Sequence, residues 1–457
     1  MARIVLIMPP MPQPMGAPYL GQLYVAASAM ADGHDVRCID LAAPLAPRGS
    51  EGFAFAVDEV RRFKPDIVGM TLFTAGAARG YRLAKLLRPH TPMLVAGGPH
   101  PTVVPGEPQR FGFDRSVVGE GEHAIIELAR ACDAKLSKSV MAPRAPDDDG
   151  RWLEGSELDR LPFPHTAYDA FDRTMYGHAG VSSSGIMSSR GCPARCTFCA
   201  NYVTGRSYRW RSTENVVAEI IESRQRYGIR HVAFWDDAFT ARRPRLNAIC
   251  DAFLNTPKLR GLTWSVITPG NMVKPFDLQR MRRAGCVSVN FGIESGDHGI
   301  LKVIQKGQKP KQVVEAVRAA KEAGMQTIVN FMFGFPEEGL AELGNTLDLM
   351  QELAPMTDYF NSRGVLVPFP GTAVYDRWRD TYDLEGWWLD ESRVPLEDSA
   401  DPSDPLAAMR RECEDPALDQ NFFDYPPDVS AMIARCVRFK GEHNLNAVKQ
   451  AMGGAAA

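Results

Sequence analysis

The sequence predicts an α/β fold made of two consecutive series of strands and helices. In the first series, short apolar runs occur at Ile4–Met8, Val36–Ile39, Ile67–Leu72, Met93–Ala96 and Ser116–Val118, with helical patterns between them. Such alternation is typical of a parallel sheet joined by right-handed crossovers. A second series of strands and helices follows, and the length of 457 residues exceeds that of one typical core. We therefore expect at least two domains.

The first series fits a doubly wound, flavodoxin-like domain over residues 1–140. It has five strand candidates, and the helical patterns between them include Leu20–Ala31 and Ala78–Leu87. In folds of this kind, ligands bind at the carboxyl ends of the strands. We expect the binding residues of this domain in the turns that follow the apolar runs.

The second series predicts a partial (β/α)6 barrel over residues 181–380, with its chemistry at the carboxyl ends of the strands. The six strand candidates are Gly185–Ser189, His231–Trp235, Leu262–Ile267, Val287–Ile293, Thr327–Phe333 and Tyr359–Val367. The Pro- and Asp-rich stretch 143–150 indicates a linker at 141–180.

Residues 381–457 are expected to form a small, mostly helical region that closes the substrate pocket. Its aromatic residues either line that pocket or belong to the core, which is the default for aromatic side chains. These residues are Trp387, Trp388, Phe422, Phe423 and Tyr425.

The composition is that of an ordinary globular protein, with 45% hydrophobic and 23% charged residues. The formal net charge of −3 gives no reason to expect a nucleic-acid partner, and the sequence has no apolar run long enough to span a membrane. Six of the nine cysteines are scattered rather than spaced as a disulfide framework. We expect a cytoplasmic protein.

The other three cysteines, Cys192, Cys196 and Cys199, form a CxxxCxxC triplet just after a predicted strand. Thiolates hold iron–sulfur clusters, and a four-iron cluster needs one ligand for each iron. A loop with three cysteines leaves one iron open for a substrate or cofactor. A zinc site would need a fourth ligand, and the upstream candidates His165 and His178 lack the usual spacing.

With Phe198 before its last cysteine, the triplet resembles the signature of the radical S-adenosylmethionine (SAM) superfamily. The resemblance implies that Cys192, Cys196 and Cys199 are catalytic, bind a [4Fe–4S] cluster and leave an iron that chelates SAM. Reductive cleavage of SAM would then give a 5′-deoxyadenosyl radical, with the electron supplied by a reductant such as flavodoxin or ferredoxin.

Further segments at the ends of the barrel strands support this resemblance. Asp236 and Asp237 follow the second strand, where they would receive the SAM ammonium group or cap a helix, and Arg211 would face the site or the solvent. Glu294 and Ser295 match the GxES motif of the family, and Val367–Thr372 matches its PxPGT signature. The residues expected at SAM are Phe198, Asp236, Asp237, Glu294, Ser295, Asn330 and Phe335.

The front domain resembles the cobalamin-binding domain that one large branch of this superfamily carries. The resemblance rests on Met8–Pro10 after the first strand, Gly97–Thr102 after the fourth and Val118–Glu122 after the fifth. Glycine at such positions lets the backbone approach a bulky ligand. The residues expected at cobalamin are Pro10, Met15, Gly16, Thr71, Leu72, Phe73, Thr74, Gly97, Gly98, His100, Thr102, Gly119, Glu120 and Gly121.

The DxHxxG motif, whose histidine ligates cobalt in many cobalamin proteins, is absent after the first strand. His34 lies before the second strand without the required glycine, so we interpret it as a turn residue. Cobalt is therefore expected to have no histidine ligand, and His100 is interpreted as a hydrogen-bonding residue of its loop. A side chain such as Leu72, Phe73 or Thr74 would lie near the lower face.

The resemblance implies a cobalamin-dependent radical SAM methyltransferase. It would methylate an unactivated carbon of a small molecule, using the 5′-deoxyadenosyl radical and methylcobalamin. One alternative keeps both cofactors but forms or rearranges a ring without methyl transfer, as the anaerobic cyclase of chlorophyll biosynthesis does. A second is methylthio transfer, but members of that family have more cysteines in the first domain, where this chain has only Cys38 and Cys132.

Overall fold

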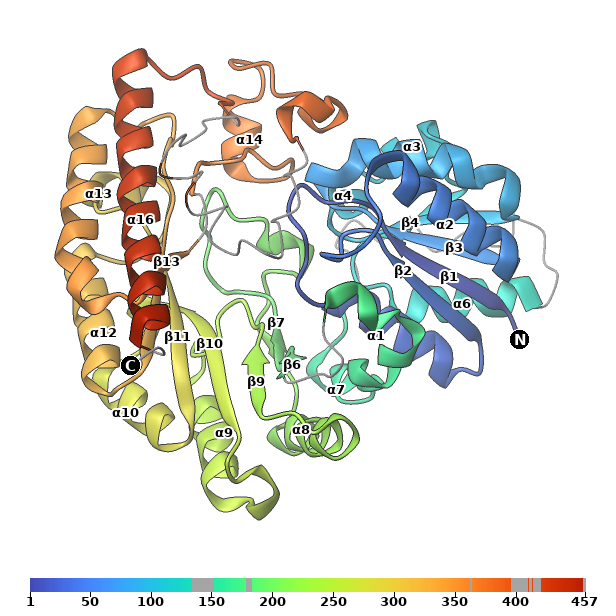
Figure 1. Cartoon of the computed structure of the whole chain (residues 1–457), viewed down its shortest axis with the longest axis horizontal. Helices are drawn as coiled ribbons and strands as arrows, with labels where there is room; N and C mark the ends of the chain where they lie inside the picture. Colours follow the sequence, from blue (N-terminus) through green and yellow to red (C-terminus); the bar gives the residue numbers. More distant parts are fainter. Residues whose placement is uncertain are drawn as a thin grey trace. The chain divides into compact units, whose positions relative to one another are not determined.

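The computed structural model describes residues 1–133, 152–177, 183–361, 364–395, 410, 413 and 421–454. The chain divides into two compact units (Figure 1). The first comprises Met1–Val181 and Gly386–Ser399, and the second comprises Ser182–Glu385 and Ala400–Ala457. The chain therefore returns to the first unit after the second series of strands, and the predicted region 381–457 is shared between the units. The Pro- and Asp-rich stretch 143–150 lies outside the described residues.

The first unit contains a five-stranded parallel sheet in the order β2-β1-β3-β4-β5. This is the flavodoxin-like order that the sequence predicts. Five of the six residues of β1 are buried, as expected for a strand covered on both faces. The strands are β1 (Arg3–Met8), β2 (Asp35–Asp40), β3 (Ile67–Thr71), β4 (Met93–Gly97) and β5 (Arg115–Ser116).

Helices connect these strands (Figure 1). They are α1 (Leu20–Ala31), α2 (Gly49–Phe63), α3 (Ala77–Leu87), α4 (Pro99–Val103), α5 (Glu107–Arg110) and α6 (Glu122–Asp133), with short 3-10 turns at η1 (Thr74–Gly76) and η2 (Arg88–His90).

The predicted linker is folded in its described part. It contains α7 (Gly155–Leu158), η3 (Pro164–Ala170) and η4 (Arg173–Tyr176). The Tyr176 hydroxyl donates to the carboxylate of Asp40 at the end of β2. This segment is therefore part of the first unit.

The second unit contains a six-stranded parallel sheet in the order β13-β12-β11-β10-β9-β6. Each strand lies beside its predecessor in this series, which confirms the six strands of the predicted partial barrel. The strands are β6 (Ser183–Ile186), β9 (His231–Phe234), β10 (Thr263–Pro269), β11 (Cys286–Glu294), β12 (Gln326–Phe331) and β13 (Tyr359–Asn361). The last is shorter than the predicted Tyr359–Val367, although Val365 still forms an isolated bridge with Phe333.

The helices of the second unit are α8 (Thr213–Tyr227), α9 (Arg243–Asn255), α10 (Pro275–Arg283), α11 (His298–Val303), α12 (Pro310–Glu322), α13 (Leu340–Leu353), α14 (Ala373–Trp378) and α16 (Pro427–Gly454). A small antiparallel pair, β7 (Ser189–Arg190) and β8 (Arg209–Trp210), follows β6. The final helix α16 packs along α13 and β13 (Figure 1). No helix among the described residues is long and apolar enough to cross a membrane.

Side chains alternate between the two faces of this second sheet. On β10, Trp264, Val266 and Thr268 are buried, and the Trp264 ring stacks on Phe253 of α9 at 5.5 Å between centroids. The residues between them are only half-buried and point to the opposite, inner face. The same alternation occurs on β9 and β12. The side chains of the outer face are therefore buried against the helices, while those of the inner face stay partly exposed.

Candidate active site

The cysteine triplet lies in the loop that follows β7. Cys192 is buried, and Cys196 and Cys199 are half-buried. The loop begins at Gly191, which has a φ of 81°. A Cβ on this residue would lie 2.3 Å from the carbonyl oxygen of Ser207, so only glycine fits this position. The backbone therefore fixes where the three thiols lie.

Two distant segments of the second unit hold the middle of this loop. The Thr197 amide donates to the Ile304 carbonyl at 3.0 Å, and the Val374 amide donates to the Thr197 carbonyl at 3.0 Å. Ile304 follows the fourth strand of the barrel, and Val374 lies in α14, just after the predicted PxPGT segment that follows the sixth. These two hydrogen bonds tie the middle of the loop to the barrel.

Burial raises the pKa of all three thiols, that of Cys199 to about 12. The positive charge of Lys306 opposes this shift at each of them. Iron binds the thiolate, so a nearby cation favours the ligand form. No three His, Cys, Asp or Glu side chains in the described part of the chain converge as the ligands of one metal ion do. In a cubane each thiolate binds a different iron, so the three thiols need not converge on one point.

Lys306 is a site residue that the sequence analysis missed. Its side chain is only 9% exposed, and its Nζ lies 2.6 Å from Oε1 of Glu294 and 5.8 Å from the centroid of the Phe198 ring. Burial lowers the pKa of Lys306, but the charges of Glu294, Cys196 and Cys199 outweigh that effect and raise it. Lys306 lies in a turn with no recognisable motif, so only the tertiary structure brings it to the cluster loop.

An irregularity at the end of β11 directs the Glu294 side chain toward Lys306 and the cluster loop. It has a φ of 73°, and the register of β11 against β12 shifts between Gly292 and Glu294. A bulge of this kind redirects a side chain. Ser295, in contrast, is fully buried, with its hydroxyl 3.1 Å from that of Thr346. Glu294 can therefore face a ligand, whereas Ser295 supports the turn and its contact with SAM remains a prediction.

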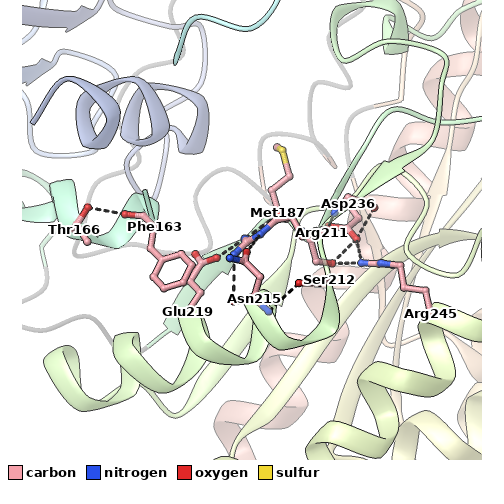
Figure 2. A network of polar contacts seen from close by, with 11 residues as sticks. Phe163, Thr166, Met187, Arg211, Ser212, Asn215, Glu219, Asp236 and Arg245 are labelled. Atoms are coloured by element: carbon pink, nitrogen blue, oxygen red, sulfur yellow. Dashed lines mark hydrogen bonds and ion pairs between the residues drawn. The ribbon is translucent and has the colours of Figure 1, made fainter. Parts of the chain in front are cut away.

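Asp236 braces the start of the cluster loop (Figure 2). Its carboxylate accepts hydrogen bonds from the amides and hydroxyls of Ser188 and Ser189, all between 2.7 and 3.1 Å, and lies 2.8 Å from Nη2 of Arg245. Both Asp236 and Arg245 are buried. These contacts give Asp236 a structural role, and its predicted contact with SAM is untested.

Asp237 is the better placed of the two aspartates to receive an ammonium group. Its side chain is exposed, accepts a hydrogen bond from the Thr204 hydroxyl at 2.9 Å and interacts electrostatically with Cys192 and Cys199. Although the residue is exposed, protein atoms around its carboxyl group partly desolvate it and raise its pKa, against the effect of the bond from Thr204.

Arg211 faces neither the site nor the solvent, contrary to both readings of the sequence. It is buried and forms an ion pair with the buried Glu219 of α8 (Figure 2). It also donates to Oδ1 of Asn215 at 2.7 Å and to the carbonyl of Met187 at 3.3 Å. The guanidinium therefore fastens the end of β6 to α8.

The two SAM residues expected near the fifth strand lie in different surroundings. Asn330 is half-buried on the inner face, and its amide donates to the side chain of Asn290. Phe335 is buried, with its ring 5.8 Å from that of Phe198 in the cluster loop. The structure thus brings Phe335 to the loop, while a contact of either residue with adenosine remains a prediction.

The aromatic residues after residue 381 are packed in the interior. Trp387, Trp388, Phe422 and Phe423 are buried, and the Tyr425 hydroxyl donates to the Gly334 carbonyl at 2.6 Å. Of the two readings, the structure favours core residues over pocket lining.

Ionisation of the Glu338 carboxyl group makes the stability of the second unit depend on pH. Its Oε2 accepts from the amides of Gly334 and Phe335 at 2.7 and 3.1 Å, yet burial raises the pKa of the carboxyl group to about 8. An acid whose pKa is raised on folding stabilises the protein at low pH, and that stabilisation is lost as the pH rises through the folded value.

We therefore expect the melting temperature of the wild type to fall relative to that of Glu338→Gln between pH 5 and pH 9, by at least about 2 °C. Thermal unfolding followed by circular dichroism at both pH values measures this difference. Glu337→Gln, which changes the neighbouring carboxyl group, is the control. A difference that stays constant across this range would show that Glu338 is ionised throughout.

The residues expected at cobalamin gather at the carboxyl edge of the first sheet. Gly98, with a φ of 95°, brings the turn after β4 close to the turn after β3, and the His100 amide donates to the Leu72 carbonyl at 2.9 Å. The Thr102 hydroxyl donates to the Gly98 carbonyl at 2.8 Å and accepts from the Gly119 amide at 3.1 Å. Three strand ends are thereby joined into one surface.

These residues differ in how much surface they offer to a ligand. Pro10, Leu72, Thr74 and His100 are buried, and the Glu120 carboxylate accepts from the Leu153 amide. At least partly exposed are Met15, Gly16, Thr71, Phe73, Gly97, Gly98, Thr102, Gly119 and Gly121. An open, glycine-rich edge fits a bulky ligand, while the predicted contacts of individual residues remain untested.

The two histidines behave as the sequence indicates. His100 is fully buried, with Nε2 2.9 Å from Oε1 of Glu107 and Nδ1 3.3 Å from the Thr74 hydroxyl. His34 accepts from the Ala2 amide at 3.1 Å, at the opposite edge of the sheet from the strands' carboxyl ends. Both ring nitrogens of His100 are therefore occupied by protein groups.

Comparison with known proteins agrees with both halves of this arrangement. The model of the radical SAM superfamily matches residues 186–350, and that of the B12 binding domain matches residues 16–129. The uncharacterized methyltransferase PH0819 of Pyrococcus horikoshii is 30% identical over 82% of this chain and 82% of its own length. The chain belongs to the cobalamin-binding radical SAM enzymes.

The chain is also similar to two other proteins. The anaerobic magnesium-protoporphyrin IX monomethyl ester cyclase of Cereibacter sphaeroides is 25% identical over 72% of this chain and 55% of its own length. The methyltransferase TsrM of Kitasatospora setae, solved with tryptophan substrate and a SAM analogue, shares the fold. It has a TM-score of 0.66 and 19% identity, and the match covers 83% of this chain and 76% of that one.

Membership of this family establishes the cofactors as a [4Fe–4S] cluster, SAM and cobalamin. The residues present fit these groups. Three thiols in one loop suit the cluster, and Asp237, Glu294 and Lys306 surround that loop with the charges that complement an amino acid. The predicted cobalamin residues lie at the carboxyl ends of the parallel strands of the first unit, and Asp237 and Glu294 lie at the carboxyl ends of β9 and β11 in the second.

Proposed function

We propose that this enzyme transfers a methyl group to an unactivated carbon atom of a small molecule. The observation that carries the proposal is that one chain contains both a cobalamin-binding domain and a cysteine triplet that leaves an iron open. Its relatives include a methyltransferase. When bound, the cluster with SAM supplies the radical that removes hydrogen, and cobalamin supplies the methyl group.

In this proposal the chain's own residues bind and orient SAM beside the cluster loop. Cys192, Cys196 and Cys199 hold the cluster, Asp237 receives the ammonium group, and Lys306 with its partner Glu294 receives the polar groups of the methionine and ribose parts. The buried contacts of Asp236 and Thr197 keep the loop in place during this binding. Oriented charges of this kind act most strongly where water is excluded.

The proposal also includes a one-electron reductant such as flavodoxin or ferredoxin, because reductive cleavage of SAM needs an electron. We place the enzyme in the reducing cytoplasm, where Cys192, Cys196 and Cys199 would stay available as thiol ligands.

The test is anaerobic reconstitution with iron, sulfide and hydroxocobalamin, followed by incubation with methyl-labelled SAM, a chemical reductant and tryptophan, the substrate seen with TsrM. We expect 5′-deoxyadenosine and S-adenosylhomocysteine, and a gain of one labelled methyl group by any accepted substrate. A protein that cleaves SAM but retains no cobalamin would refute the cobalamin part of the proposal.

The second candidate is ring formation or rearrangement without methyl transfer, which the similarity to the cyclase favours. It keeps the radical step and predicts a product without added carbon. Label in the product therefore separates the two candidates.

Lys306 gives a direct test of the proposed SAM site. Loss of a hydrogen bond to a charged group costs about 1.5–3 kcal/mol, so Lys306→Met should weaken SAM binding roughly 10- to 100-fold. Equilibrium dialysis of the reconstituted enzyme measures this affinity. Lys302→Met, which removes an exposed lysine of α11, is the control and should leave the affinity unchanged. Equal affinities of Lys306→Met and wild type would exclude Lys306 from the site.

A further inference from the structure

Trp235 is the large aromatic side chain most exposed in the described part of the second unit. It follows the last residue of β9, and 57% of its surface is exposed, whereas Trp264 on the neighbouring strand is fully buried. No aromatic ring of the described residues is paired with it. A solvent-exposed indole at the carboxyl end of a barrel strand needs an explanation, because binding residues are concentrated at that edge.

Strand alternation sends this indole to the inner face of the sheet. Val232 and Phe234 are buried on the outer face, where the Phe234 ring lies 5.8 Å from that of Trp264. Ala233 points the opposite way. The Trp235 amide still donates to the Ile186 carbonyl at 2.8 Å, which keeps the strand extended for one more residue. Trp235 therefore continues the inner face that Ala233 begins.

The neighbouring strand is shaped to support the ring. Gly185 of β6 pairs with Ala233, and a Cβ on Gly185 would lie 3.1 Å from Cδ1 of Trp235. Glycine lets the indole lie against the backbone of β6. The register of β6 against β9 ends with Ile186 opposite Phe234, and Met187 and Trp235 are the next residues of the two segments. Figure 2 shows the Met187 side chain pointing away from the buried contacts of Arg211.

This support stands next to the cluster loop. Asp236, the residue after Trp235, holds Ser188 and Ser189 at the start of the loop, and Asp237 interacts electrostatically with Cys192. The inner face around Trp235 thus lies within the same unit and at the same strand ends as the radical-initiating site.

We infer that Trp235, with Met187 beside it, is a stacking platform for a planar, conjugated ring in the substrate. The inference rests on the proposed function and adds the class of molecule that bears the acceptor carbon. An indole offers a large, rigid π-face at low cost in conformational entropy, and a thioether adapts to the edge of a ring.

The test measures binding without turnover. The reconstituted full-length enzyme is dialysed against naphthalene-2-carboxylate and its saturated counterpart decahydronaphthalene-2-carboxylate, which share charge and carbon skeleton. We expect the planar acid to bind roughly two- to tenfold more tightly, as the 0.5–1.5 kcal/mol of an aromatic pair implies. Trp235→Ala should abolish this preference and Trp235→Phe should retain part of it. Phe276→Ala is the matched control, because Phe276 of α10 is 56% exposed.

Three results would overturn the inference. The first is equal binding of the two acids by the wild type, and the second is a preference for the planar acid that survives in Trp235→Ala. The third is a loss of SAM affinity in Trp235→Ala as large as its loss of affinity for the planar acid, which would place the adenine ring on Trp235. None of them bears on methyl transfer itself, which the label in the product decides.

Discussion

Replacing any one of Cys192, Cys196 and Cys199 with alanine is expected to lower reductive cleavage of SAM roughly 1000-fold or more, to the background of protein without a cluster. Each thiolate binds a different iron, so no other cysteine ligand can compensate. Barrel segments hold the loop through the backbone of Thr197, and the three variants should therefore fold normally. Iron content, electron paramagnetic resonance and 5′-deoxyadenosine formation after anaerobic reconstitution measure the effect.

The control for this series is Cys250→Ala. Cys250 is a fully buried free thiol of α9 in the same unit, so its replacement tests the loss of a buried sulfur without loss of a cluster ligand. It should retain the cluster and the cleavage activity. Undiminished 5′-deoxyadenosine formation by any of the three triplet variants would disprove the assignment of the cluster.

The largest effect on stability is expected from Asp236→Ala. The change leaves the buried guanidinium of Arg245 without its carboxylate and removes the acceptor for four groups of Ser188 and Ser189. Breaking a buried ion pair from one side costs about 3–5 kcal/mol of unfolding free energy. Urea unfolding followed by circular dichroism and tryptophan fluorescence measures the loss for the transition of the second unit.

Two matched variants separate this structural role from a role in binding. Asp237→Ala removes an exposed carboxylate and should change the free energy of unfolding by no more than about 0.5 kcal/mol while weakening SAM binding. Asp236→Ala combined with Arg245→Met should recover part of the lost stability, because it removes the unpaired charge. A single Asp236→Ala variant as stable as the wild type would show that the pair is not a brace.

The elements that the sequence predicted well are those with a strong local pattern. Apolar runs such as Ile4–Met8 correspond to buried parallel strands, and the flavodoxin-like order of the first sheet was confirmed. All six barrel strands were found, with errors only at their ends. The described part of the last strand is Tyr359–Asn361, shorter than its apolar run, and Val365 adds an isolated bridge to Phe333.

The contacts that the sequence analysis did not predict involve side chains whose partners are far away in the sequence. Arg245 lies 57 residues after the Ser188 hydroxyl to which it donates, and Lys306 lies in a turn without a motif. The segment after residue 386 was assigned to a closing region, yet the Trp388 indole donates to Glu107 of the first unit at 2.9 Å. Such pairs leave no periodicity that a single sequence could reveal.

The sequence by itself determined the chemistry: three cysteines at cluster spacing, the strand-end motifs and a cobalamin-type first domain without a histidine ligand at the usual position. These features are local, because ligand spacing and strand periodicity involve neighbouring residues. Only the tertiary structure decided that Asp236 braces the loop while Asp237 is exposed, that Lys306 lies at the thiols, and that Trp235 faces inward. Those outcomes depend on burial and on contacts between strands, which the folded chain alone defines.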